Sequence, residues 1–404
     1  MHLQLIREFS LSRWIIIAYG TSVQALNAIL REKAMIIGIP KESLRDETRV
    51  ALTPAGANAL ARHGHKIIVQ AEAGNGSGFS AEDYRDAGAD IVFSAEEVFA
   101  RADLLAKLMP PTPEECGWIA EQGFLLSVVH MGAVNQKAHG MLRERGTTAV
   151  GVELIEDADH SLPVLTAMSE IAGMLLPQIA GRFLETSMRG RGILLGGVAG
   201  IPPSHVVIIG AGTVGSTAAR MFLGAGASVT VMDEDLRRLR FVDMQLHKMT
   251  TTALAAPFNI ERFLVSADVV VGSVLIHGRQ APHVVTDSVV RKMKHGSVII
   301  DVSIDQGGCV ETSRPTTLSD PIFVKHGVTH YCVPNIPSSV ARTASHAFSN
   351  VVLPFLMEVG ESGIRAFREN ATLRRGVYLY TGKCAHEGLA GLLGWEFESI
   401  DTLT

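Results

Sequence analysis

The sequence has few cysteines and lacks a cysteine pair with metal-binding spacing. Its 404 residues include only Cys116, Cys309, Cys332 and Cys384, and no two of these form a C-x-x-C motif. Zinc sites and disulfide frameworks bring their cysteines together at short, regular spacings. We therefore predict four buried thiols, no metal site and a reducing, cytoplasmic environment.

Positive charge is also scarce, and the N-terminus lacks a long apolar stretch. The formal net charge is −5 and no block of lysines or arginines occurs, so neither a nucleic-acid partner nor an anionic membrane is indicated. The apolar run Trp14–Tyr19 is far too short to span a bilayer. We interpret residues 1–34 as an N-terminal extension, because Met35–Pro40 is typical of the first strand of a domain.

The chain does contain an alternation of short apolar strands with helical segments. Strands are predicted at residues 36–39, 66–70, 104–108 and 124–130, and helices at residues 54–63 and 81–87. Such alternation favours a parallel sheet with helices on both faces. The length of 404 residues, 47% of them hydrophobic, suggests two or three domains with substantial cores.

Two long segments with helical apolar periodicity divide the chain. Ala167–Thr186 is predicted as a connecting helix kinked at Pro177, and Ala341–Gly360 as a helix leading back to the first domain. The predicted fold class is therefore α/β, with two Rossmann-like, doubly wound domains. The first domain is discontinuous, with residues 35–165 and 336–404, and residues 166–335 form the second.

The second domain contains a complete phosphate-binding βαβ pattern. The strand Val206–Ile209 runs into Gly210, Gly212 and Gly215, which suit a tight turn, a close approach to a pyrophosphate and close packing of the next helix. The N–H groups that open this helix would face the phosphates. With 39 glycines in the chain an isolated motif arises by chance, but the flanking strand and helix make an ordinary glycine turn a poor alternative.

Asp233 indicates which dinucleotide binds. It ends the strand Ser228–Asp233, where an acidic side chain accepts hydrogen bonds from the adenosine ribose and repels a 2′-phosphate. We therefore predict that residues 166–335 bind NAD. Further apolar strands at residues 267–274 and 297–303 belong to the same domain, so the residues that follow them are expected near the ligand.

Additional motifs follow one another over nearly the whole chain after Ala34. They are Gly38–Glu42, Glu47–Pro54, Met168–Gly173, Ile304–Cys309, Ser313–Thr317 and Tyr331–Asn335. Together with the glycine motif, this set resembles the alanine dehydrogenase and pyridine nucleotide transhydrogenase family. The alanine dehydrogenase branch fits better, because transhydrogenase subunits lack a histidine at the position of His130. The resemblance implies an NAD-dependent oxidoreductase and a homo-oligomer, often a hexamer.

The resemblance also implies roles for individual residues. Arg49 would bind the substrate carboxylate, His130 would be the general acid/base, and Asp305 would lie beside the reacting carbon and the nicotinamide. Ser169 and Asn335 would lie near the bound cofactor. From the residues alone, a surface arginine, a structural histidine and an Asx-turn aspartate stay open as alternatives.

At Met109 the sequence departs from the alanine dehydrogenases. The resemblance places there a lysine that hydrogen-bonds the substrate and polarises its carbonyl, and Lys107 is not expected to replace it. Losing a buried ammonium beside an anion costs on the order of a hundredfold in rate. The flexible, apolar Met109 suits a larger side chain or an N-alkyl group on the substrate.

Three functional hypotheses follow from these observations. The first is an NAD-dependent amino acid dehydrogenase, which reversibly deaminates an L-amino acid to a 2-oxo acid and ammonia. The second is an NADH-dependent imine or ketimine reductase, since His130 can protonate a preformed imine directly. The third, which the presence of His130 disfavours, is a transhydrogenase-like module that binds NAD(H) and passes hydride to a partner protein.

Overall fold

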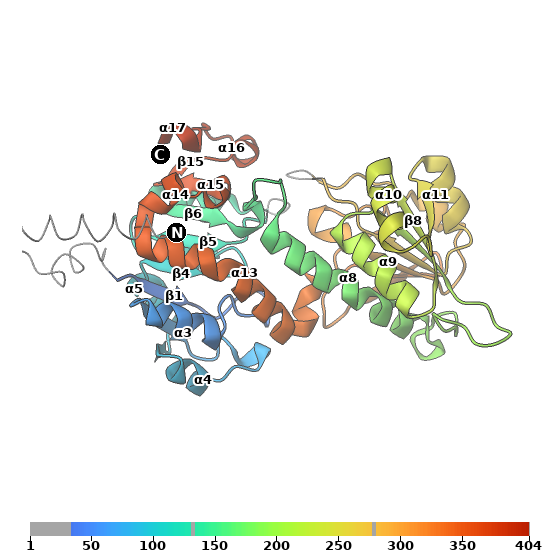
Figure 1. The fold of residues 1–404 in the computed structure, drawn as a ribbon, viewed down its shortest axis with the longest axis horizontal. Helices are drawn as coiled ribbons and strands as arrows, with labels where there is room; N and C mark the ends of the chain where they lie inside the picture. Colours follow the sequence, from blue (N-terminus) through green and yellow to red (C-terminus); the bar gives the residue numbers. More distant parts are fainter. Residues whose placement is uncertain (1–33, 131–133, 277–279, 404) are drawn as a thin grey trace, which may run out of the picture.

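Two largely parallel sheets, one in each half of the molecule, organise the chain (Figure 1). The computed structural model describes residues 34–130, 134–276 and 280–403, so the predicted extension lies almost wholly outside the described residues. The first sheet has eight strands and the second has seven. The predicted α/β fold class is confirmed.

The first sheet is built from both ends of the chain. Its strands are β1 (Ile36–Ile39), β2 (Lys66–Gln70), β3 (Ala89–Val92), β4 (Leu104–Ala106), β5 (Phe124–Ser127), β6 (Thr148–Gly151), β14 (Val377–Tyr380) and β15 (Lys383–Cys384). The spatial order is β3-β2-β1-β4-β5-β6-β14-β15, in which the pairs β6–β14 and β14–β15 are antiparallel and the others are parallel. The strand order reverses between β1 and β4.

The second sheet repeats this order. Its strands are β7 (His205–Ile209), β8 (Ser228–Asp233), β9 (Thr251–Leu254), β10 (Val269–Gly272), β11 (Val298–Asp301), β12 (Ile322–Lys325) and β13 (Val328–Tyr331). The parallel strands lie in the order β9-β8-β7-β10-β11-β13, with β12 antiparallel at the edge. Runs of valine and isoleucine fill the central strands because both faces of this sheet are buried.

Helices connect the strands in each lobe. The first lobe has α3 (Pro54–Arg62), α4 (Ala81–Asp86), α5 (Ala95–Arg101), α6 (Pro113–Trp118) and α7 (Gln136–Glu144). The second lobe has α9 (Thr213–Gly224), α10 (Leu236–Gln245), α11 (Pro257–Leu264) and α12 (Asp287–Val290). The C-terminal region has α14 (Ala366–Glu369), α15 (Ala371–Arg375), α16 (Glu387–Leu393) and α17 (Ile400–Leu403). Local sequence sets several helix starts. Ser80 and Thr112, for example, each begin a capping box. All four cysteines are buried and unpaired, as predicted.

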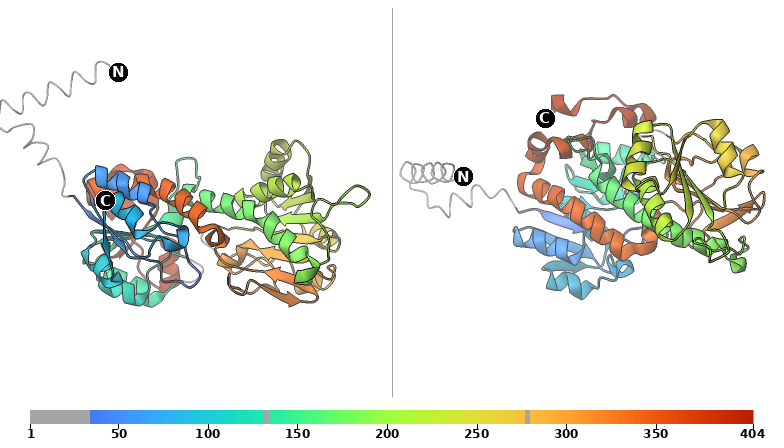
Figure 2. Two further views of the ribbon diagram at one scale, coloured as in Figure 1. Left: turned by 90° about the horizontal axis from the view of Figure 1, so that it is seen from below. Right: turned by 45° about the vertical axis from the view of Figure 1, so that its right-hand side comes forward.

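Two long helices, α8 (Pro163–Leu184) and α13 (Ala341–Ser362), run side by side where the lobes meet (Figures 1 and 2). Within the described part of the chain, α8 is the helix long and apolar enough to span a bilayer. However, it buries Leu176, Ala180 and Leu184 in the core of the second lobe. Met168, near its N-terminus, packs against the cores of both lobes. We conclude that α8 is a core helix that ties the lobes together.

We predict opposite effects of alanine at two glycines of α8. A Cβ at Gly173 would lie 2.8 Å from both Thr217 Cβ and Val214 O of α9, so Gly173→Ala should destabilise the fold by about 1–3 kcal/mol. A Cβ at Gly181 meets nothing nearer than 3.6 Å, so Gly181→Ala should stabilise it by about 0.5–1 kcal/mol. Urea unfolding of both variants measures these changes, and equal effects would show that α8 and α9 are not closely packed.

Candidate active site

The predicted substrate and acid/base residues follow three neighbouring strands of the first sheet. Arg49 lies in the segment after β1, Met109 follows β4 and His130 follows β5. Because β1 and β4 flank the point where the strand order reverses, this edge is where such sheets bind ligands. The fold therefore brings together residues that are far apart in the sequence.

Arg49 forms a buried ion pair with Glu47. Nε donates to Oε1 at 2.8 Å and Nη2 to Oε2 at 2.6 Å, and the arginine is only 4% exposed. Burial alone would raise the pKa of Glu47, but the hydrogen bonds and charge of Arg49 hold it below its ordinary value. The outer edge of the guanidinium, Nη1 with the second proton of Nη2, is not used by Glu47. We did not assign Glu47 to the site from the sequence, although a buried guanidinium requires an anionic partner.

The second lobe reaches the same carboxylate. Asn335, which has a left-handed φ of 61°, donates from Nδ2 to Glu47 Oε2 at 2.5 Å, and Ser338 Oγ donates to the same oxygen at 3.2 Å. Met168 places its Sδ 3.5 Å from Arg49 Nη1. Glu47 is therefore the point at which groups from both sides of the junction converge.

Ser169, which was predicted near the cofactor, directly follows Met168 on α8 and is half-buried. Its hydroxyl makes no hydrogen bond to another described site residue, so only its neighbour Met168 connects it with the site. Met168 itself was missed, because a methionine on a long apolar helix is indistinguishable from a core residue in sequence. The signal that selects it is its contact with a buried cation.

Asp305 faces the first lobe from the turn η5 (Val302–Gln306) that follows β11. Its Oδ2 lies 3.5 Å from the backbone nitrogen of Asn335, and its carboxyl is close enough to His130 and Arg49 to feel their charges. The surrounding protein raises the pKa of Asp305, whereas His130 and Arg49 oppose that effect. Part of the residue is nevertheless exposed to solvent.

The Asx-turn alternative for Asp305 applies instead to Asp301. Oδ1 of this fully buried aspartate accepts the backbone N–H of Ser303, and Oδ2 accepts those of Cys309 and Val310. Asp301 therefore shapes the turn and Asp305 projects from it.

Met109 lies beside Asn335, with 4.0 Å between its Sδ and Asn335 Nδ2. Glu42 holds the segment before it, because its carboxylate accepts the backbone N–H of Leu108 at 2.7 Å and that of Met109 at 3.4 Å. The thioether thus occupies a defined place next to the side chains that surround Glu47.

Lys107 is engaged elsewhere. Its Nζ lies 3.2 Å from Glu42 Oε2 and 3.2 Å from Glu115 Oε1, and the residue is 1% exposed. Burial alone lowers the pKa of Lys107, but the two carboxylates together raise it above its ordinary value. Its ammonium is therefore fixed in a buried triad and does not point toward Met109.

The strand that precedes His130 is shorter than predicted. β5 ends at Ser127, and His130 has a left-handed φ of 59°. The ladder stops because the backbone N–H groups of Val129 and His130 donate to the carboxylate of Glu153 and not to a strand. The sequence did not reveal this partner, because it lies beyond the next strand.

The glycine motif adopts the geometry expected of a dinucleotide site. Gly210 has a φ of 104°, and a Cβ at Gly215 would lie 1.8 Å from the Gly210 oxygen. Gly212 is the N-cap of α9 and provides no side-chain cap, so N–H groups of the first turn are free for a ligand anion. A Cβ at Gly212 would meet nothing within 4 Å, so open space lies before the helix. These residues fit NAD.

Asp233 ends β8 at the same place. Oδ2 accepts the Ala211 N–H at 2.7 Å and Oδ1 accepts the Asp235 N–H at 2.8 Å, which aims the carboxylate and leaves a lone pair on each oxygen. Arg238 Nη1 lies 3.8 Å from Oδ2. This arginine was not predicted, and it places a cation at the adenosine end of the proposed NAD site.

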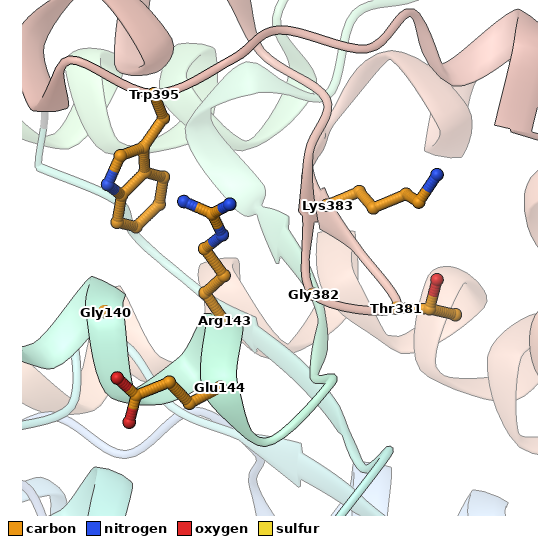
Figure 3. A pocket seen from close by; sticks show the side chains of 7 residues that line it. All are labelled: Gly140, Arg143, Glu144, Thr381, Gly382, Lys383 and Trp395. Carbon is orange, nitrogen blue, oxygen red and sulfur yellow. The ribbon is translucent and has the colours of Figure 1, made fainter.

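A shallow depression on the first lobe lies elsewhere, between α7 and the β14–β15 turn (Figure 3). The Arg143 guanidinium carbon lies 5.1 Å from the centre of the Trp395 ring. Figure 3 shows Lys383 directed away from both, and its Nζ pairs with Glu398 at 2.7 Å. We assign this depression no function.

Comparison with known proteins identifies relatives along nearly the whole chain. Residues 38–172 match the family described as alanine dehydrogenase/PNT, N-terminal domain, and residues 177–387 match the corresponding C-terminal domain. The alanine dehydrogenase of Mycobacterium tuberculosis is 41% identical over 364 residues, which are 90% of this chain and 98% of that protein.

Solved structures agree with this similarity. An L-alanine dehydrogenase superimposes with a TM-score of 0.85 at 38% identity and covers 89% of this chain and 99% of its own. The transhydrogenase from Sinorhizobium meliloti has a TM-score of 0.74 at 23% identity, covering 87% of this chain and 99% of its own. The second likeness shows a common fold only.

We predict that alanine substitutions separate cofactor binding from folding in the glycine motif. Gly212→Ala should keep wild-type stability, since its φ of −71° suits alanine and its Cβ meets no protein atom. It should weaken NADH binding by roughly tenfold or more, because a loss of 1.4 kcal/mol suffices. Gly215→Ala should lower stability as well, because its Cβ clashes with backbone. Fluorescence titration with NADH and urea unfolding test both, and unchanged NADH affinity in Gly212→Ala would contradict the assigned site.

Proposed function

The chain belongs to the alanine dehydrogenase/PNT family, and we propose that it is an NAD-dependent amino acid dehydrogenase whose substrate choice is set by Met109. It is accordingly an oxidoreductase of the class that acts on CH–NH₂ donors. The observation that carries the finer proposal is the thioether beside Asn335, at a place where the family resemblance implies an ammonium.

We assign the roles within the site as follows. Arg49 binds the substrate carboxylate through the outer edge of its guanidinium, because Glu47 occupies the other edge. The Met168 thioether now at Nη1 is a weak acceptor, which a carboxylate displaces. His130 moves the proton at the substrate nitrogen, and Asp305 faces the reacting carbon. A nicotinamide bound at the glycine motif would supply or accept the hydride at that carbon.

The balance of charge supports a substrate with a cationic nitrogen. Arg49 and Glu47 neutralise one another, Asp305 adds a carboxyl group, and Met109 adds no charge. Lys107 does not compensate, because Glu42 and Glu115 hold its ammonium. An ammonium or iminium group on the substrate is therefore favoured over a neutral ketone, because Met109 offers no ammonium to polarise the ketone oxygen.

The same observation favours a second candidate, an NADH-dependent imine or ketimine reductase. An apolar thioether at position 109 tolerates a carbon substituent on the substrate nitrogen, whereas an ammonium there requires a polar partner. A preformed imine needs only one proton from His130 and one hydride. This reaction differs from reductive amination in that it needs no free ammonia.

We further propose NAD as the cofactor, since the Asp233 carboxylate opposes a 2′-phosphate. Cytoplasmic location is supported by the four buried, unpaired thiols. We expect a small-molecule substrate and a homo-oligomer, in keeping with the family resemblance.

We predict that lysine at position 109 shifts the reaction toward pyruvate. Met109→Lys should raise kcat/KM for NADH-dependent amination of pyruvate on the order of a hundredfold, because it restores a charge-assisted hydrogen bond to the carbonyl. The measurement is NADH oxidation with pyruvate and ammonium, and with cyclic and N-alkyl imines in ammonia-free buffer.

Met109→Leu is the matched control for this variant. It keeps an apolar side chain of similar size, so it should retain the substrate preference of the wild type, including any activity on imines. Wild-type protein that aminates pyruvate as fast as Met109→Lys would overturn the role of Met109. If none of the tested 2-oxo acids or imines causes the protein to oxidise NADH, the proposed function is overturned.

A further inference from the structure

One part-buried carboxylate outside the substrate site, that of Glu153, holds the backbone of His130. Glu153 lies in the turn η3 (Val152–Leu154), directly after β6. Its Oε1 accepts the backbone N–H of Val129 at 2.9 Å and that of His130 at 3.0 Å, and Oε2 lies 3.2 Å from the Val129 nitrogen. The side chain of Glu153 therefore accepts the backbone N–H groups that a continuing β6 strand would otherwise pair with.

The position of Glu153 follows from the strand pairing. β5 and β6 are parallel neighbours whose last pair is Ser127 with Gly151, so Glu153 continues β6 just beyond the end of the ladder. A Cβ at Gly151 would lie 2.5 Å from Val129 Cγ2, which shows how closely the segments approach. The carboxylate is thus held against the point at which the chain turns into the left-handed conformation of His130.

A carboxylate is a costly choice for this task. Burial raises the pKa of Glu153 to about 7 in spite of the N–H groups it accepts, and among the described residues no basic side chain opposes this effect. A neutral amide offers the same carbonyl oxygen to both N–H groups without the cost of burying a charge.

We propose that Glu153 is a positioning residue, which fixes the peptide of His130 and so directs the imidazole toward Asp305 across the junction. Hydrogen bonds to an ionised acceptor are about twice as strong as neutral ones, so the anion holds this peptide more rigidly than an amide does. The left-handed backbone of His130 has no strand to hold it and depends on these bonds. The inference rests on the proposed role of His130 as proton carrier.

The first test separates turnover from binding. Glu153→Ala should lower kcat about a hundredfold, since a displacement near 1 Å has that effect, and Glu153→Gln should lower it roughly tenfold. The KM for the carbonyl or imine substrate and the affinity for NADH should stay within about twofold, because Glu153 contacts neither of the proposed binding groups. Glu358→Gln is the matched control. Its carboxylate accepts a hydrogen bond from Asn370 in the same lobe, and its kcat should be unchanged.

The second test uses stability, which separates positioning from a structural role. Because the folded-state pKa is raised from 4.5 to about 7, the unfolded chain loses this proton first, and native stability falls between these pH values. The melting temperature of Glu153→Gln relative to wild type should therefore rise from about pH 5 to about pH 8. Among the described residues, the titratable neighbours are His130 and Tyr378, and Cys116 and His139 in turn face Tyr378.

The outcomes are distinct. Wild-type kcat in Glu153→Ala overturns the proposal. The proposal is supported if Glu153→Gln has a lower kcat than the wild type but an equal or higher melting temperature at about pH 8. A purely structural role predicts instead that kcat and the melting temperature fall together. If wild-type protein turns over no substrate, the imidazole ¹³Cε1 resonance of His130, assigned with His130→Gln, still decides. The proposal predicts that this resonance shifts in Glu153→Ala and stays in Glu358→Gln.

Discussion

The buried ion pair between Arg49 and Glu47 is the interaction on which the candidate site depends. Both side chains are almost inaccessible to water, and charges in such surroundings are tolerated only when paired. Asn335 and Ser338, which lie on the segment that enters α13, donate to the same carboxylate. The pair therefore connects the loop after β1 with the second half of the chain. It also fixes which edge of Arg49 is free for a substrate carboxylate.

Met109 changes the electrostatics around this pair without changing the backbone that presents it. Glu42 accepts the N–H groups of Leu108 and Met109, so the segment is held whatever side chain position 109 carries. The ammonium of Lys107 belongs to that same support and does not reach the site. Under the proposed function, the substrate nitrogen supplies the positive charge that Met109 does not. This is the physical reason for expecting a different nitrogen chemistry on an otherwise familiar scaffold.

Features set by local sequence could be predicted, and features set by distant partners could not. Gly210 and Gly215 were predictable because a tight turn and a close backbone approach permit no side chain. Glu47 was not, because its partnership with Arg49 depends on both being buried by the second half of the chain. For the same reason, the sequence predicted that β5 extends to His130, whereas the strand ends at Ser127. Glu153, which terminates the ladder, lies beyond β6 and is recognisable only once the two strands are paired.

The junction between the two lobes contains backbone conformations and charged groups that are each unfavourable on their own. His130 and Asn335 have positive φ angles, and the pKa values of Asp305 and Glu153 are raised. Such features persist only where the surrounding structure holds them, and that support comes from the two sheets and from the packing of α8 on α9. The residues that hold the junction in place are therefore distinct from those to which we assign the chemistry. Met109 lies between these two groups, because it packs against the core of the first lobe and also lies beside Asn335 at the junction.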